Sequence, residues 1–135
     1  MGHIRLLHPR HWDVTRRRFD KIAFKKSSDG GLSVVEVECA NATSGLICEH
    51  LATFYPGVGG DPAVFMLVDD GEWPVGSNIT PTVLENNDEC HREVDGVSNG
   101  QLQRLFQSRD WHGFLICDPM GVRNLTDEDV DSFGG

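Results

Sequence analysis

Two short apolar runs constrain the fold of this chain more than any other feature. The first is AVFMLV, residues 63–68, and the second is GFLIC, residues 113–117. Runs of this length and composition are typical of strands that are covered on both faces. The chain has 135 residues, which is enough for one domain with a real hydrophobic core. We therefore expect a single compact domain, residues 1–135, built around a central sheet.

Alternation of apolar and polar residues predicts further strands at 4–7, 19–25, 32–39 and 90–94. The segment SSDGG, residues 27–31, separates two of them, and its Asp-Gly and Gly-Gly pairs favour a tight turn. We expect 19–25 and 32–39 to form a β-hairpin. Residues 69–88 read as a long loop, which points to a functional loop or to a short strand within it.

Helical patterns occur in three places. Residues 43–55 carry one apolar stripe and end at Pro56. Ser98 and Gln101 form a capping box for a helix to about Arg109, and Thr126 caps a last helix with an acidic first turn. The expected fold class is therefore α+β, with a single mixed or antiparallel sheet and two or three helices packed on it.

The charge distribution is lopsided. The net charge of the chain is −9, yet residues 1–26 hold eight Lys or Arg against two Asp. The other 109 residues hold four basic and nineteen acidic residues. Such asymmetry bears on partners and solubility rather than on the fold.

The basic segment gives the first functional hypothesis, a small binding or regulatory protein. It would hold an anionic ligand or an acidic macromolecule: a nucleotide, single-stranded nucleic acid or an acidic protein. Aromatic residues interleave with the cations, an arrangement that can stack bases. Attraction of the cations to the acidic remainder of the chain is the alternative. The acidic remainder disfavours a long DNA duplex. The candidate binding residues are Arg10, Trp12, Arg16, Arg17, Arg18, Lys21, Lys25 and Lys26.

The second hypothesis is a small enzyme. On a strand, His91 and Glu93 share a face, so the carboxylate could orient the imidazole for acid–base catalysis. Arg5 would then bind a phosphate of the substrate. This hypothesis requires the three groups to converge on one cleft.

Three residues resemble the core of the ADP-ribosyltransferases. Arg5 lies on the first predicted strand, Ser33 on a second and Glu93 on a later one. This is the order of the Arg–Ser–Glu core of that family. The resemblance implies that these three residues form one site.

Cysteine and histidine residues suggest metal sites only weakly. His8, His11 and Asp13 lie close in sequence, but Pro9 keeps His8 out of a helix. The set Cys48, His50, Cys90 and His91 has the donors for zinc, although positions 48 and 50 point apart on a helix. We expect no bound metal and no cofactor.

The remaining signals concern location and the chain end. No apolar run is long enough to cross a membrane, and residues 1–13 lack the apolar core of a secretory signal. We therefore expect a cytoplasmic protein without membrane contact and with four reduced cysteines. GVGGD at 57–61 lacks the order of a phosphate loop and reads as a connection. The terminal Gly134-Gly135 is similar to the tails of ubiquitin-like and sulfur-carrier proteins, which implies activation of the terminal carboxylate.

Overall fold

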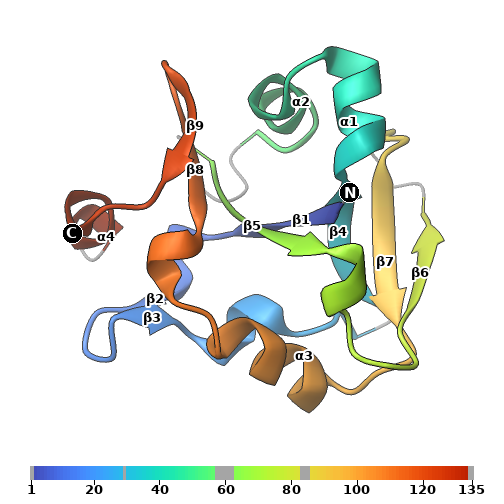
Figure 1. Cartoon of the computed structure of the whole chain (residues 1–135), viewed down its shortest axis with the longest axis horizontal. Helices are drawn as coiled ribbons and strands as arrows, with labels where there is room; N and C mark the ends of the chain where they lie inside the picture. Colours follow the sequence, from blue (N-terminus) through green and yellow to red (C-terminus); the bar gives the residue numbers. More distant parts are fainter. Residues whose placement is uncertain (1, 29, 57–62, 83–85, 134–135) are drawn as a thin grey trace.

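Seven strands form one antiparallel sheet, in the order β6-β7-β4-β1-β5-β8-β9 (Figure 1). The structure, a computed structural model, describes residues 2–28, 30–56, 63–82 and 86–133. The strands are β1 (Gly2–Leu7), β4 (Leu32–Glu36), β5 (Val64–Asp69), β6 (Asn78–Pro81), β7 (His91–Asp95), β8 (Leu115–Asp118) and β9 (Gly121–Asn124). A separate hairpin joins β2 (Trp12–Asp13) to β3 (Arg18–Phe19).

In the described part of the chain four α-helices accompany this sheet, which confirms the α+β class with more helices than the two or three expected. In Figure 1, α1 and α2 lie on one side of the sheet and α3 on the other. The α-helices of the described residues are α1 (Val37–Ser44), α2 (Ile47–Phe54), α3 (Asn99–Gln107) and α4 (Asp127–Phe133). Short 3₁₀ helices are η1 (Pro9–His11), η2 (Lys21–Phe24), η3 (Asp70–Glu72) and η4 (Trp111–Gly113).

The two faces of the sheet belong to two different hydrophobic cores. Met66 of β5 packs in the core that contains Leu102 of α3, whereas its neighbour Phe65 packs with Leu51 of α2. Successive side chains of a strand point to opposite faces, so a strand between two cores must be apolar at nearly every position. This confirms the predicted strand, here Val64–Asp69, and its coverage on both faces at Val64, Phe65 and Met66, whereas Leu67 is 41% exposed.

Several other sequence predictions are confirmed. The first strand and the strand that starts near Cys90 are β1 and β7. The capping box of Ser98 and Gln101 opens α3, and the Thr126 hydroxyl accepts a hydrogen bond from the amide of Asp129 at the start of α4. The sequence predicts either a functional loop or a short strand within residues 69–88. This segment contains η3 and the short strand β6, so the second alternative is confirmed.

The predicted hairpin of residues 19–25 and 32–39 is wrong. Asp20 accepts a hydrogen bond from the amide of Ile22 and opens the 3₁₀ helix η2. This turn buries Ala23 and Phe24, two consecutive side chains that a strand would place on opposite faces. Strand β4 pairs with β7 along Leu32–Val35 and with β1 at Val35 and Glu36, rather than with residues 19–25.

The predicted helix at 43–55 is also divided. Helix α1 begins at Val37, where the alternating pattern predicted a strand, and ends at Ser44. Gly45 follows with a φ of 79°, a left-handed conformation that glycine adopts at low cost, and its amide donates to the carbonyl of Asn41. The chain then re-enters a helix at Ile47.

All four cysteines form disulfides, which corrects the expectation of four reduced thiols. Cys39 of α1 is bonded to Cys90 just before β7, and Cys48 of α2 is bonded to Cys117 of β8. The two bonds tie the pair of helices to strands on opposite sides of the sheet centre. None of the helices in the described ranges is long and apolar enough to cross a membrane.

Loss of the Cys39–Cys90 bond should destabilise the protein. The bonded residues are 51 positions apart, and closing a loop of this size in the unfolded chain is worth about 4 kcal/mol. We expect the double variant Cys39→Ser/Cys90→Ser to unfold at a lower urea concentration, with the free energy of unfolding reduced by about 3 to 4 kcal/mol. Unreduced wild-type protein is the matched comparison, because it keeps Cys48–Cys117 as the variant does. Detection of four free thiols in unreduced, urea-unfolded protein would contradict the pairing.

Candidate functional site

A fork in the sheet forms a cleft between β1 and β4. Strands β1 and β4 pair only through His3–Glu36 and Ile4–Val35. Beyond these pairs β1 continues along β5, whereas β4 continues along β7, so the two strands part. A cavity of about 210 Å³ lies between them, which we call the fork cleft. Its lining residues are Ile4, Arg5, Leu6, His8, Arg10, His11, Ala23, Ser33, Val34, Val35, Tyr55 and His91.

Arg5 bridges the two sides of the fork. Its Nη1 donates to the carbonyl of Ser33 on β4 at 2.9 Å, and its Nε and Nη2 donate to the carbonyl of Ala23 in η2 at 3.1 and 2.9 Å. Within the described residues no carboxylate forms an ion pair with it. Burial lowers the pKa of Arg5 to about 10, so the guanidinium is still cationic at neutral pH.

The sequence HPRH, residues 8–11, brings two imidazoles and a second guanidinium to the cleft. Pro9 starts the turn η1, and the Nδ1 atom of His8 accepts the amide of Arg10 at 3.3 Å. The ring centroids of His8 and His11 are 5.9 Å apart. Burial and the nearby Arg10 lower the pKa of both histidines below the usual 6.5. Both imidazoles are therefore neutral at pH 7.

His91 also lines the cleft, but its surroundings differ from those predicted. Its side chain is 1% exposed, and Nδ1 lies 3.2 Å from the carbonyl of Thr82. Glu93 does not orient the ring, because its Oε2 accepts the amide of Gly31 instead. Nε2 of His91 is buried without a hydrogen-bond partner. Burial lowers the pKa of His91, against the opposing effects of the Thr82 carbonyl and Glu93.

The Arg–Ser–Glu set lies on three neighbouring strands. Arg5 is on β1, Ser33 on β4 and Glu93 on β7, and Ser33 is directly opposite Glu93 in the sheet. Arg5 and Ser33 line the fork cleft, whereas Glu93 lies beyond its lining. The sequence thus predicted two of the residues that share the cleft with His91.

The predicted basic surface is dispersed by the fold. Arg17 pairs with Asp127 and Asp131, Lys26 with Asp95, and Arg16 with Asp13. In the described part of the chain no ion pair involves Arg10, Arg18, Lys21 or Lys25.

Trp12 is unavailable as a stacking surface. It is 7% exposed and packs edge-on against Phe19, Trp111 and Phe133 in the core. Phe19 is buried as well. Only Arg10 of the predicted binding residues reaches the fork cleft.

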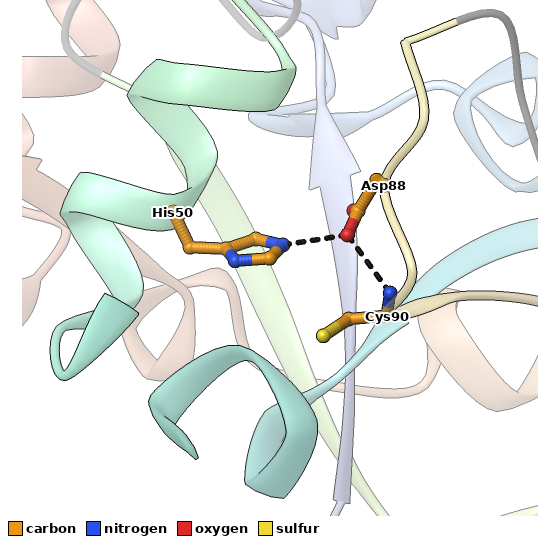
Figure 2. Close-up of side chains that lie close together, drawn as sticks. All are labelled: His50, Asp88 and Cys90. Atoms are coloured by element: carbon orange, nitrogen blue, oxygen red, sulfur yellow. Dashed lines mark hydrogen bonds and ion pairs between the residues drawn. The ribbon is translucent and has the colours of Figure 1, made fainter. Parts of the chain in front are cut away.

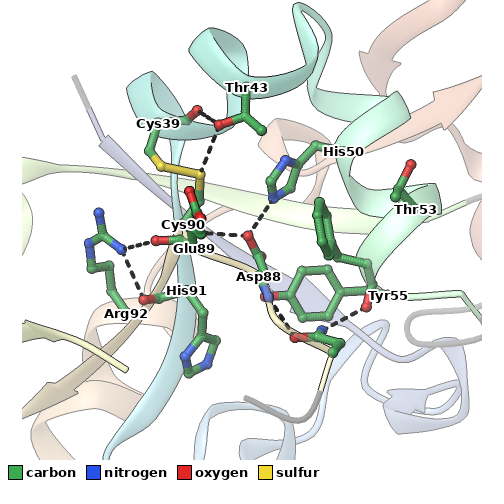
Figure 3. A network of polar contacts seen from close by, with 12 residues as sticks. Cys39, Thr43, His50, Thr53, Tyr55, Asp88, Glu89, Cys90, His91 and Arg92 are labelled. Carbon is green, nitrogen blue, oxygen red and sulfur yellow. Dashed lines mark hydrogen bonds and ion pairs between the residues drawn. A yellow bond between two sulfur atoms is a disulfide. The ribbon is translucent and has the colours of Figure 1, made fainter. Parts of the chain in front are cut away.

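Tyr55 is the cleft residue that sequence reasoning missed. It lies directly after α2, and its hydroxyl donates to the carboxylate of Asp88, which also contacts His50 (Figure 3). In the sequence Tyr55, Asp88 and His50 share no motif, so their spacing does not predict that they are in contact. His50, Asp88 and Cys90 lie together in Figure 2 and are the one possible metal cluster found among the described residues.

The sulfur and carboxylate donors of that cluster are already engaged in other bonds. Cys90 is part of a disulfide, and both carboxylate oxygens of Asp88 accept hydrogen bonds. Cys48 is bonded to Cys117, so the four zinc donors weighed from the sequence are not all available. Asp13 accepts the amides of Thr15 and Arg16 rather than approaching His8 and His11. Residues 57–61 and the terminal Gly134-Gly135 lie outside the described residues.

Comparison with known proteins gives no match to a family model, a curated protein or a solved structure. What the cleft can do follows from its lining. Two guanidinium groups and three imidazoles line the cavity together with aliphatic residues and Tyr55, and no carboxylate of the described residues lines it. Such a lining favours a small anion with an attached apolar or planar part.

The neutral histidines should make folding stability depend on pH. The folded pKa of His91 lies below 6.5, so on acidification below 6.5 the unfolded chain takes up a proton that the folded chain resists. The free energy of unfolding should therefore fall as the pH drops. His91→Gln should reduce this slope between about pH 7 and pH 5 in urea unfolding. His112→Gln changes an exposed imidazole and is the control; equal slopes in wild type and His91→Gln would contradict the assignment.

Proposed function

We propose that this protein binds a compact phosphate-bearing ligand in the fork cleft, with Arg5 as the anchoring cation. The observation that carries the proposal is a buried guanidinium that, among the described residues, donates hydrogen bonds to backbone carbonyls and forms no ion pair with a carboxylate. Carbonyl groups fix its position without neutralising its charge, so an anion can still gain from it.

The rest of the lining supports an anionic group joined to a less polar one. Arg10 is exposed at the cleft and adds a second positive charge. Ile4, Leu6 and Val35, together with the ring of Tyr55, offer an apolar wall. A cavity of about 210 Å³ is smaller than the pockets that enclose drug-sized ligands, so it suits one portion of a nucleotide.

An extended polyanion has weaker support. Single strands are usually held by aromatic platforms between basic residues, and both Trp12 and Phe19 are buried. Arg17 is occupied by two aspartates. We therefore narrow the proposed partner from nucleic acid or an acidic protein to a small nucleotide-like ligand.

The disulfides bear on where this binding would occur. Disulfides persist in oxidising surroundings and are rare in the cytosol. The two bonds, Cys39–Cys90 and Cys48–Cys117, therefore favour an oxidising compartment over the cytoplasmic location expected from the sequence.

Calorimetric titration with ADP tests the proposal. We expect wild-type protein to bind ADP with an affinity that falls as salt rises, and Arg5→Gln to weaken binding by about tenfold or more. Arg5→Lys keeps the charge without the fork of donors and should be intermediate. Circular dichroism confirms that each variant is folded.

Arg18→Gln is the matched control, because Arg18 belongs to the same basic segment but lies outside the fork cleft. Its affinity for ADP should stay within about twofold of wild type. Equal losses for Arg5→Gln and Arg18→Gln, or no ADP binding by wild type, would overturn the proposal.

ADP-ribosyl transfer is the second candidate function. It is favoured by the placement of Arg5, Ser33 and Glu93 on three neighbouring strands, with Ser33 opposite Glu93. A carboxylate near the ribose can stabilise the oxocarbenium-like transition state of glycosidic cleavage. In the simplest form of the reaction, water replaces nicotinamide at the ribose, and NAD⁺ gives ADP-ribose, nicotinamide and a proton.

Chromatographic detection of nicotinamide tests this candidate. Wild-type protein should release nicotinamide from NAD⁺, and Glu93→Gln should lower the rate by about a hundredfold or more. Asp95→Asn removes an exposed carboxylate two residues along the same strand and should leave the rate unchanged. Absence of release by wild type, or an unchanged rate in Glu93→Gln, would exclude the candidate.

A further inference from the structure

A fully buried carboxylate lies directly behind the fork cleft. Asp88 is 0% exposed, and within the described residues no Lys or Arg forms an ion pair with it. Its Oδ1 lies 2.9 Å from Nε2 of His50 and accepts the amide of Cys90 at 2.9 Å, as Figure 2 shows. Its Oδ2 accepts the hydroxyl of Tyr55 at 2.5 Å.

Asp88 contacts two walls of the cleft, one through its carboxylate and one through its backbone carbonyl. Tyr55 lines the cleft and follows α2, whereas His91 lines it from β7. Asp88 reaches Tyr55 through the hydroxyl, and it reaches His91 through the backbone, because its carbonyl accepts the amide of His91 at 3.3 Å. Figure 3 shows Asp88 between α2 and the start of β7. One residue thus contacts walls that come from separate elements.

Asp88 is itself held rigidly. Its amide donates to Oδ1 of Asn86 at 3.1 Å, and Nδ2 of Asn86 donates to the carbonyl of Phe54 at 2.7 Å. Asn86 therefore links the loop before β7 to the end of α2. The disulfide Cys39–Cys90 fixes the same loop to α1.

The pKa shifts of Tyr55 and Asp88 indicate that Tyr55 donates the hydrogen bond between them and that Asp88 accepts it. Burial acts to raise the pKa of Asp88, but hydrogen bonds from Tyr55, Cys90 and His50 outweigh it and lower the pKa below the usual value. Burial and the Asp88 carboxylate raise the pKa of Tyr55 well above its ordinary value. The hydroxyl of Tyr55 therefore keeps its proton and donates a hydrogen bond to Asp88. The aromatic ring is then the part of Tyr55 that is available to a ligand in the cleft.

We propose that Asp88 is the positioning residue of the fork cleft. Its carboxylate holds the hydroxyl of Tyr55 and its carbonyl holds the backbone amide of His91, so both walls keep the arrangement that the ligand needs. His50 and the Cys90 amide hold the carboxylate in turn. This inference rests on the proposed binding of a phosphate-bearing ligand, because positioning has meaning only where a ligand binds.

The chain offers a direct readout, because Tyr55 is its single tyrosine. The ultraviolet absorbance of the phenolate in an alkaline titration therefore reports Tyr55 alone. We expect Asp88→Asn to lower the pH at which Tyr55 ionises, since Asp88 and Asn86 are the polar side chains that face its hydroxyl. The same variant should weaken ADP binding by about tenfold.

The matched control is Asp110→Asn. Asp110 also contacts a histidine, at 2.7 Å from Nδ1 of His112, but the pair is exposed and away from the cleft. This variant should change neither the ionisation of Tyr55 nor the affinity for ADP. Tyr55→Phe removes only the hydroxyl tether and should weaken ADP binding by about threefold or more. It decides the question if Asp88→Asn does not fold.

The outcomes are distinct. Weaker ADP binding in folded Asp88→Asn or in Tyr55→Phe, with Asp110→Asn unchanged, supports the inference. Wild-type affinity in Asp88→Asn despite easier ionisation of Tyr55 shows that the network is merely structural and overturns it. Wild-type affinity in Tyr55→Phe does the same where Asp88→Asn is unfolded. No ADP binding by wild type overturns the proposed function, and the positioning role with it.

Discussion

The guanidinium of Arg5 is the group on which the arrangement of the cleft depends. Two strands that pair through only two residue pairs leave backbone groups facing the gap between them. Arg5 donates to one such carbonyl, that of Ser33 on β4, and also to the carbonyl of Ala23 in η2, and so links β1 to both segments. A hydrophobic side chain there would leave the carbonyls unpaired, which is costly in a buried site. The same cation that completes the fold is available to an anion.

Two other parts of the molecule bear on this cleft. The turn at Pro9 returns His8, Arg10 and His11 over the cleft, and the buried network of Asp88 supports the opposite wall. The disulfide Cys39–Cys90 ties that network to α1. Both walls of the cleft are thus held by contacts with the residues that pack behind them. Such support is expected of a preorganised binding site.

Local signals predicted the fold better than they predicted the site. The capping box at Ser98 and the apolar run at 63–68 were readable because each depends on neighbours in sequence. The hairpin failed because the alternation from Lys21 to Lys25 also fits a 3₁₀ turn that Asp20 caps. Arg5 and His91 were selected for their chemistry, but only the sheet order brings them to one cleft. Tyr55 and Asp88 carried no signal, since their contact joins segments 33 residues apart.

Nuclear magnetic resonance of the arginine side chains gives the most direct test of the central claim. In protein labelled with nitrogen-15, addition of ADP should shift the Nε–H signal of Arg5 and the amide signals of Ser33 and Val35, because all three residues line the fork cleft. The side-chain signal of Arg18 should stay in place. Shifts confined to Arg16 and Arg18 in the β2–β3 hairpin, with Arg5 unaffected, would contradict the account.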